Sequence, residues 1–359
     1  MAQYWIAGTL KGDLRAHIQP SNVSWQSNGT VLDPGRGTFT IDVNDENTRG
    51  IDLWDLTEQW RNTIVVTEGD ETLYAGTIIR SPLHVGDRTI RVETREVGVF
   101  LGLRMLYQVG NYDRGTMAFK YRSLRGVAIE SIHKALGLGS ERWNLPIYVP
   151  ASESGNRWPQ YVASDFATAA EWLEEQVGQD GGPVCDLYPT LTGDKLQWNL
   201  QVGNPRLDAG TVEVNVAAQQ SPITNLVLDR DGSHQRTGVF SIGNGAGKSM
   251  IHGEAAEPSV RLGKPDMPFI DGTVPMKEEK SVAKANARAK AELARWINGE
   301  RGVAFDWTYG DGWAPLKPHM TVNLYGNVAG LFDLDAQVRV LSVGGRGDTT
   351  QQLTLEAEW

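Results

Sequence analysis

The stretch GNGAGKS, at residues 243–249, is the part of the sequence that most resembles a cofactor-binding motif. A phosphate-binding loop has the pattern G-x-x-x-x-G-K-[ST], because a loop of that length wraps its backbone N–H groups around the phosphates before a helix begins. Here Ile242 occupies the position of the first glycine, and the residues from Ser249 to Pro258 show no helical period. The spacing therefore predicts a glycine-rich connection that follows a strand, and no nucleotide site.

The sequence also offers few ligands for a metal ion. No two of the six histidines have ligand spacing on a common element, which excludes a local zinc motif. Asp229–Gly232 begins like a calcium loop but lacks the glycine two positions later and the final Glu, so we predict a turn there. Residues 42–46 fail the same test. The single Cys185 excludes an internal disulfide, and we expect it to be a small buried hydrophobic residue.

Residues for acid–base or nucleophilic catalysis are equally scarce. Glu171, Glu174 and Glu175 lie on the polar side of an expected helix, where solvated carboxylates are the ordinary case. No G-x-S-x-G elbow for a serine hydrolase is present, and the tripeptide Arg346–Asp348 is expected to form a turn. We therefore predict that the chain is not an enzyme, with no catalytic, cofactor-binding or metal-binding residues and no cofactor.

Composition and charge narrow the class of protein. With 359 residues the chain can hold two or three domains, and 40% hydrophobic and 22% charged residues are typical of a soluble globular protein. No run of about 18 apolar residues is present, so no membrane span is expected. A net charge of −10 argues against sequence-independent DNA binding, which needs a basic face. The 12 tryptophans are spread along the chain and are expected to anchor cores and interfaces.

Strands dominate both ends of the chain. Apolar and polar residues alternate at 39–43, 90–93, 303–308 and 352–359, as half-buried antiparallel strands require. The segments LHVGDRTIRVE (83–93) and GGRGDTTQQLTLE (344–356) each place a Gly-Asp turn before such a strand. Two copies of one barrel would explain this similarity between the two segments. The preference of Gly and Asp for turns would also explain it without any duplication.

Three helices interrupt the strand pattern. Apolar residues at helical spacing predict helices over about 123–136, 164–177 and 277–297. Ser164 is the expected N-cap of the second helix, and the third is expected to stop at Asn298-Gly299. The fold class is therefore mainly β with an α/β insertion. We divide the chain into a first β region (1–105), an α/β insertion (106–205) and a second β region (206–359) that carries an inserted loop and long helix at about 243–298.

The middle of the chain carries a family resemblance. The segment FATAAEWLEEQVGQDGGPVCDLYPTLTGDKLQWNLQVGNPRL (166–207) resembles the tail-hub minor tail proteins of long-tailed actinobacteriophages, as does VETREVGVFLGLRML (92–106). In those proteins a glycine-rich turn like 243–249 leads into a long, poorly structured excursion, here Met250–Val274. The resemblance implies a baseplate-hub fold, in which each subunit contributes two tail-tube-like antiparallel β-barrels to a homotrimer with pseudo-sixfold symmetry.

The same resemblance implies the partners and the location. A hub joins a hexameric tail tube or distal tail ring to a threefold tip, and it encloses the channel for the tape measure protein and for DNA in transit. The implied partners are the distal tail protein, the tail tube protein, the tape measure protein and downstream tip or receptor-binding proteins. We expect synthesis in the host cytoplasm and a final place in the virion, at the phage tail tip. Carboxylates such as Glu356 and Glu358 are expected to line the channel.

Two other functions fit parts of the sequence. A distal tail protein, which forms a hexameric ring, is the alternative among virion proteins, although its usual build lacks an insertion like 106–205. A carbohydrate-binding or cell-wall-degrading protein is the alternative from another class, suggested by the tryptophans and the paired carboxylates.

Overall fold

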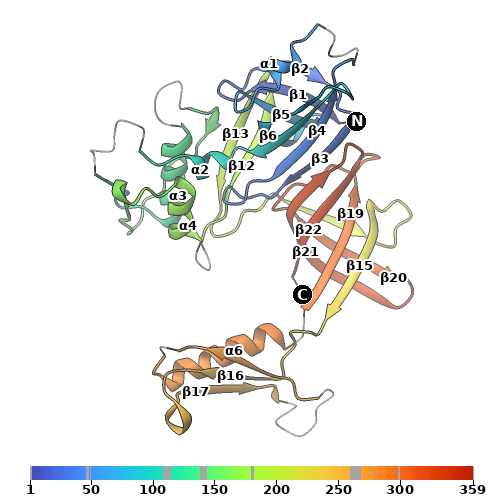
Figure 1. The fold of residues 1–359 in the computed structure, drawn as a ribbon. Helices are drawn as coiled ribbons and strands as arrows, with labels where there is room; N and C mark the ends of the chain where they lie inside the picture. The colour runs from blue at the N-terminus through green and yellow to red at the C-terminus, as the bar shows by residue number, and fades with distance from the viewer. Residues whose placement is uncertain are drawn as a thin grey trace. The chain divides into compact units, whose positions relative to one another are not determined.

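The computed structural model describes residues 2–45, 48, 50–107, 115–137, 144–178, 182–258, 268–277, 279–297 and 300–358. The chain divides into two compact units, which are described separately. Unit 1 comprises Met1–Asn225 and Phe305–Glu358, and unit 2 comprises Leu226–Ala304. Within the described ranges, no helix is long and apolar enough to cross a membrane. The chain is mainly β with antiparallel sheets, as the alternation predicted (Figure 1).

The first β region is a run of antiparallel strands in the order β3-β4-β8-β6-β5-β1-β2. Its elements are β1 (Gln3–Gly8), β2 (Leu14–Ile18), β3 (Asn22–Ser27), β4 (Arg36–Asp42), the short helix α1 (Leu53–Leu56), β5 (Asn62–Glu68), β6 (Glu71–Arg80), β7 (Leu83–His84) and β8 (Thr89–Glu96). Phe39, Ile41, Ile90 and Val92 are buried, so the predicted inward face is confirmed. Val43 is 40% exposed because β4 ends at Asp42.

The second β region has the strand order β15-β19-β22-β21-β20-β14. Its strands are β14 (Thr211–Asn215), β15 (Ile223–Asp231), β19 (Glu300–Thr308), β20 (Thr321–Val328), β21 (Phe332–Gly345) and β22 (Thr350–Glu358). Val303, Phe305 and Trp307 are buried, which confirms the alternation predicted for 303–308. Unlike its neighbours, β14 pairs with β20 in parallel.

The two β regions are joined by hydrogen bonds between β3 and β21. The pairing is antiparallel and brings Trp25 opposite Gly345 and Ser27 opposite Val343. Closing the first region into a barrel would require β3 to pair with β2. Both edges of β3 are already occupied, by β4 and by β21, so the described strands form an open ladder and not the closed barrels that were expected.

The first β region ends with the helix α2 (Val99–Leu103), and the described part of the insertion contains two α-helices and short strands. Its elements are β9 (Thr116–Ala118), α3 (Leu124–Ile132), a π-helical turn (His133–Gly137), β10 (Ile147–Tyr148), β11 (Gln160–Val162), a 3-10 turn (Ala163–Asp165), α4 (Ala169–Val177), β12 (Cys185–Thr192) and β13 (Lys195–Val202). β12 and β13 form a hairpin, with β10 parallel to β13. The helix predicted over 123–136 is confirmed, with its last turn π-helical.

The second predicted helix starts later than expected. Ser164 lies in the 3-10 turn, and Phe166 adopts a left-handed backbone with φ of 51°, which interrupts a continuous helix. Thr168 is the N-cap instead, since its hydroxyl accepts from the backbone N–H of Glu171 and the Glu171 carboxylate accepts from the backbone N–H of Thr168. This reciprocal pair is a capping box.

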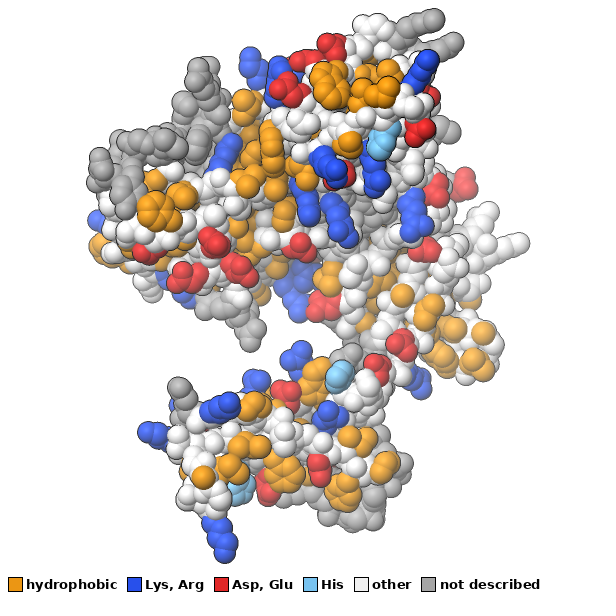
Figure 2. Space-filling model, in the orientation of Figure 1, with side chains coloured by type: hydrophobic (Ala, Val, Ile, Leu, Met, Phe, Trp, Pro, Cys, Tyr) orange, Lys and Arg blue, Asp and Glu red, His pale blue; other side chains and the backbone are white. Residues whose placement is uncertain are grey.

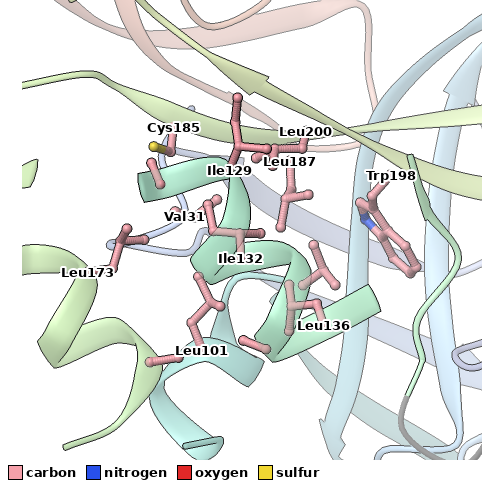
Figure 3. Packing of buried hydrophobic residues seen from close by; sticks show 14 of the residues in the cluster. Val31, Leu101, Ile129, Ile132, Leu136, Leu173, Cys185, Leu187, Trp198 and Leu200 are labelled. Atoms are coloured by element: carbon pink, nitrogen blue, oxygen red, sulfur yellow. The ribbon is translucent and has the colours of Figure 1, made fainter. Parts of the chain in front are cut away.

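One hydrophobic core joins the insertion to the first β region. Figure 3 shows Leu101, Ile132 and Leu136 packed together from the helices, with Leu187 and Leu200 of the β12–β13 hairpin. Side chains of the first β region belong to the same cluster, namely Ala7, Val31, Val65, Ala75 and Val97. The insertion therefore folds against one face of the first β region and shares its core.

Unit 2 is a small three-stranded sheet covered by one helix. Its elements are β16 (Gly238–Ile242), β17 (His252–Ala256), β18 (Asp271–Pro275) and α6 (Val282–Trp296), and α6 lies across the sheet in Figure 1. Val239, Ala289 and Leu293 form its buried cluster. Part of the stretch expected to be poorly structured is thus regular, because β17 and β18 both pair with β16. The third helix begins after the N-cap Ser281, and the expected stop at 298–299 lies outside the described residues.

Candidate functional site at the junction of the β regions

The GNGAGKS stretch connects two strands of a hairpin. Ile242 ends β16, a single 3-10 turn covers Gly247–Ser249, and β17 follows, so a strand stands where a phosphate-binding loop requires a helix. The N–H of Gly243 donates to the carbonyl of Ile251 at 2.7 Å, and the N–H of Asn244 donates to the carbonyl of Glu279 at 2.9 Å. These two backbone N–H groups are hydrogen-bonded within the protein and are not free to bind a phosphate, which supports the prediction of a glycine-rich connection.

The turn predicted for Asp229–Gly232 starts later than expected, because Asp229–Asp231 are the last residues of strand β15 and the turn follows at 233–234. The carboxylate of Asp231 accepts from the N–H of Ser233 at 2.7 Å, and hydrogen bonds from the side chain and the backbone N–H of Ser233 lower the pKa of Asp231. The carboxylate of Asp42 accepts from the N–H of Asn44 at 2.8 Å in the same way. In the part of the chain that the structure describes, no group of three or more His, Cys, Asp or Glu side chains could hold a metal ion.

The carboxylates of α4 face solvent. Glu171, Glu174 and Glu175 are exposed, and Figure 2 shows acidic side chains over the part of the insertion where Figure 1 places α4. Glu171 serves the capping box, and its hydrogen bonds to Thr168 lower its pKa. The helix therefore presents a solvated acidic surface, as predicted, and one of its carboxylates has a structural role.

Two further predictions are confirmed. Cys185 is 3% exposed, and burial raises the pKa of its thiol to about 12, which makes the thiolate unavailable at neutral pH. The Arg346–Asp348 tripeptide forms the turn between β21 and β22, with Gly347 at a φ of 91° and the Asp348 carboxylate accepting from the N–H of Thr350.

The most developed polar site of unit 1 lies where both β regions meet the insertion. The ammonium of Lys317, from the segment before β20, lies 2.5 Å from the carboxylate of Glu71 on β6 and 5.2 Å from the centre of the Tyr188 ring on β12. Tyr188 in turn donates its hydroxyl hydrogen to the carbonyl of Thr72 at 3.2 Å. Burial lowers the pKa of Lys317, but Glu71 and the Tyr188 hydroxyl outweigh burial, so its pKa lies above the ordinary value.

His319, two residues further along, makes a second set of contacts to the same strand. Its side chain is 7% exposed, and its Nε2 lies 3.6 Å from the carboxylate of Asp186 on β12. Its Nδ1 lies 3.4 Å from the guanidinium of Arg339 on β21. The loop after β3 approaches so closely that a Cβ on Gly29 would lie 2.5 Å from the Cβ of Pro318.

A buried carboxylate completes the junction. Glu96, the last residue of β8, accepts a hydrogen bond of 2.7 Å from the backbone N–H of Gly35. The pKa of Glu96 is raised to about 7, mainly by burial and also by the charge of Asp186, while hydrogen bonds from Ser27, Gly35 and Asn28 oppose the shift. The site therefore links three parts of the chain through an ion pair and hydrogen bonds, of which the contacts of His319 are shielded from water and those of Lys317 are partly exposed.

Among the described residues, the junction lacks a recognisable set of catalytic side chains. Its contacts instead connect the two β regions and the insertion. The Lys317–Glu71 pair is partly exposed, at 28% and 46% of the two side chains, and it acts together with the more buried contacts of His319 to connect the regions. Sequence reasoning identified none of Lys317, His319 and Glu96 as site residues. His319 is one of the six histidines that lack ligand spacing in the sequence, and no local spacing connects it with Asp186.

Comparison with known proteins identifies the fold. No protein-family model and no curated protein sequence matches the chain. The 43 kDa tail protein of prophage MuSo2 from Shewanella oneidensis aligns with a TM-score of 0.57 and 11% identity, over 99% of this chain and 98% of that one. A tail protein from Neisseria meningitidis MC58 aligns with a TM-score of 0.52 and 16% identity, over 99% and 96%.

A third similar structure comes from a protein complex. A chain of the Francisella PdpA–VgrG complex aligns with a TM-score of 0.55 and 8% identity, and this protein covers 52% of that chain. At such identities the likeness concerns the fold. This chain therefore has, over nearly its whole length, the fold of these two tail proteins.

Proposed function

We propose that this chain is the tail hub of a long-tailed phage, a structural virion protein without enzymatic activity. The observation that carries the proposal is the alignment with two tail proteins, one of them from a prophage, over 99% of this chain and nearly all of theirs. The resemblance of 166–207 and 92–106 to the hub proteins of actinobacteriophages narrows a tail protein to a hub. The hub joins a hexameric tail tube or distal tail ring to a threefold tip.

The presence of two β regions in one chain supports a homotrimer. Three copies would arrange six tail-tube-like β regions, 1–105 and 206–359 of each, around one axis. Such a ring can contact a sixfold partner on one side and a threefold partner on the other. The ladder of described strands ends at β2 and β15, and a ring protects such edges by pairing or packing across neighbouring copies.

The junction contacts support a role in holding that ring together. A subunit that places two β regions around a channel must keep them at a fixed spacing. Lys317 and His319 connect the second β region to Glu71 of the first and to Asp186 of the insertion. These contacts combine with the β3–β21 pairing to connect the two regions within one subunit.

The proposed partners follow from this place in the tail. The distal tail protein and the tail tube protein bind one side of the ring, and downstream tip or receptor-binding proteins bind the other. The tape measure protein and DNA pass through the channel. The chain needs no cofactor or metal ion for this role.

Two alternative functions are distinguished from the hub by experiment. A distal tail protein would form a ring of six copies, and the fold of prophage tail proteins is compatible with it. A carbohydrate-binding or cell-wall-degrading protein is favoured by exposed aromatic residues, namely Trp54, which is 63% exposed, and Trp158, which is 46% exposed.

The decisive experiment is a cryo-electron microscopy reconstruction of the tail tip with this chain placed in the density. Three copies around the axis are expected, with the two β regions alternating. Six copies around the axis would refute the hub proposal and identify the chain as a distal tail protein. A glycan array and a peptidoglycan-release assay on the purified full chain test the third function, and specific glycan binding or release of cell-wall fragments would favour it.

A further inference from the structure

An arginine-rich surface covers the outward face of β4 and β8 in the first β region. Buried residues alternate with exposed or half-buried ones along both strands, so the outward residues share one face. Strand pairing places Arg36 directly opposite Arg95, and Arg91 lies on the same face of β8. Arg80, at the end of β6, pairs with Glu93 of β8 at 3.2 Å. We call the four arginines of this surface the basic patch.

The charge of the basic patch is only partly balanced within the chain. Among the described carboxylates, Glu93 alone forms an ion pair with the patch, and Arg36 and Arg91 have none. Like charges directly opposite each other on neighbouring strands, as in Arg36 and Arg95, destabilise a sheet. Figure 2 shows Lys and Arg side chains gathered over the part of unit 1 where Figure 1 draws β3, β4 and β6. An acidic surface of another molecule would supply the missing charge.

A surface of opposite charge lies on β14, β20 and β21 of the second β region. Glu213 of β14 and Asp333 and Asp335 of β21 are exposed, and none of them forms an ion pair with a described residue. Tyr325 of β20 is aligned with Asp335 and is 45% exposed. The outward residues beside them on these strands are uncharged, namely Asn215, Asn323, Asn327 and Gln337. We call the three carboxylates with Tyr325 the acidic patch.

The two patches do not meet within one chain. The basic patch lies on β4 and β8, and β4 is separated from β21 by β3. β3 pairs with β21 at Val343–Gly345, whereas Asp335 lies eight residues earlier on the same strand. At about 3.3 Å per residue this is a distance of about 26 Å along β21. Each patch is therefore available to a different molecule.

We propose that the basic patch of one copy binds the acidic patch of a neighbouring copy. A contact between two different surfaces of the same chain is head-to-tail, and it closes into a ring when the rotation from copy to copy completes a full turn. In a ring where the two β regions alternate, the first region of one copy lies beside the second region of the next, and these regions carry the two patches. The number of copies rests on the proposed hub function, whereas the pairing of the patches does not.

Charge and composition favour a second copy over a nucleic acid as the partner. The chain carries a net charge of −10, which repels a polyanion, and Glu93 lies among the arginines of the basic patch. Single exposed ion pairs add little affinity, but complementary groups of charges select the partner and its orientation. Tyr325 and the aliphatic parts of the arginines supply the apolar contact that such an interface also needs.

The contact is tested by reversing its charges in the full chain and measuring self-association by sedimentation velocity at about 0.05 M salt. The basic-patch variant carries Arg36→Glu with Arg91→Glu, and the acidic-patch variant carries Asp333→Arg with Asp335→Arg. Each variant should weaken self-association about tenfold or more, because like charges then face each other. The chain with all four substitutions should regain the association of the wild type to within about threefold, because the charges are again complementary.

Controls with the same change in charge are available on exposed helix surfaces. Lys284→Glu with Arg288→Glu on α6 matches the basic-patch variant, and Glu174→Arg with Glu175→Arg on α4 matches the acidic-patch variant. Both controls should associate like the wild type. Urea unfolding of every variant checks that it is folded, and recovery in the fourfold variant could not result from misfolding.

Several results would overturn the proposal. They are a wild-type chain that stays monomeric at concentrations on the order of 100 µM, patch variants that associate like their controls, and a fourfold variant that fails to recover. Binding of a short DNA duplex that is lost in the basic-patch variant would assign that patch to nucleic acid instead. The hub function is tested separately by the tail-tip reconstruction: six copies with the patches in contact would refute only the hub, and three copies with the patches apart would refute only this contact.

Discussion

At the scale of single residues, Glu96 makes the stability of the protein depend on pH. Its pKa of about 7 in the folded state exceeds its ordinary value of 4.5, mainly because of burial. Between these two values the folded chain holds a proton that the unfolded chain has lost. Stability therefore falls as the pH rises from about 4.5 to about 7, and the penalty is fully present above pH 7.

Glu96→Gln should remove this penalty. The difference in unfolding free energy between the variant and the wild type is measured by urea unfolding at pH 8 and at pH 5. We expect this difference to favour the variant by about 1–2 kcal/mol more at pH 8 than at pH 5. Glu175→Gln, which changes an exposed carboxylate of α4, is the matched control and should show little pH-dependent difference. A gain from Glu96→Gln that is the same at both pH values would contradict the explanation.

Gly29 reports the close approach of the two β regions at the junction. Gly29 and Gly69 have similar backbones, with φ of 60° and 56°, but a Cβ would meet Pro318 at 2.5 Å at the first position and nothing within 4 Å at the second. Alanine costs about 1 kcal/mol of backbone strain at either position. Gly29→Ala should cost about 1–3 kcal/mol more than Gly69→Ala in urea unfolding, because of the added clash. Equal losses of stability for the two variants would mean that the loop around Gly29 moves to accommodate the methyl group at no cost in free energy.

At the scale of elements, the start of α4 shows how a cap selects a helix boundary. Thr168→Ala removes the capping box and should destabilise unit 1 by about 1 kcal/mol. Ser164→Ala is the control, since the Ser164 hydroxyl contacts only the Asp165 carboxylate, at 3.4 Å, among the bonds that the structure gives it. Urea unfolding measures the stability that each variant loses. A larger loss for Ser164→Ala than for Thr168→Ala would contradict Thr168 as the N-cap and support a helix that begins at Ser164.

At the scale of the whole molecule, charge is divided unevenly between the two units. Of the 44 acidic and 34 basic residues, 10 and 12 fall within 226–304, which leaves 34 and 22 in the rest of the chain. The whole acidic excess thus belongs to unit 1, which contains the first β region, the insertion and most of the second β region. A carboxylate-rich wall would repel DNA in transit and keep it centred, whereas a basic wall would bind it through counterion release.

We therefore predict that the channel of the assembled ring is lined by a net negative surface contributed by unit 1. Glu356, which is exposed on β22, is a candidate for that wall, whereas the side chain of Glu358, expected to face the channel too, lies outside the described part of the structure. The measurement is the summed charge of the side chains that face the channel in a reconstruction of the ring. A neutral or positive sum would leave the net charge of −10 as an ordinary contribution to solubility.

The sequence by itself determined the elements whose signals are local. Period-2 alternation placed Phe39, Ile41 and Trp307 on buried faces, because successive side chains of a strand point to opposite sides. Helical spacing identified α3, α4 and α6, although tertiary context moved the start of α4 from Ser164 to Thr168. The same local reasoning recognised that 243–249 lacks the spacing of a phosphate-binding loop.

Only the tertiary structure decided how these elements combine. The pairing of β3 with β21 occupied the edge that would have closed the first barrel, and no local pattern specifies which strand takes an edge. Lys317 and Glu71, or His319 and Asp186, are far apart in the chain, so their contact depends on the packing of three regions. The pKa of Glu96 has the same origin, because burial is a property of the assembled fold and not of any short segment.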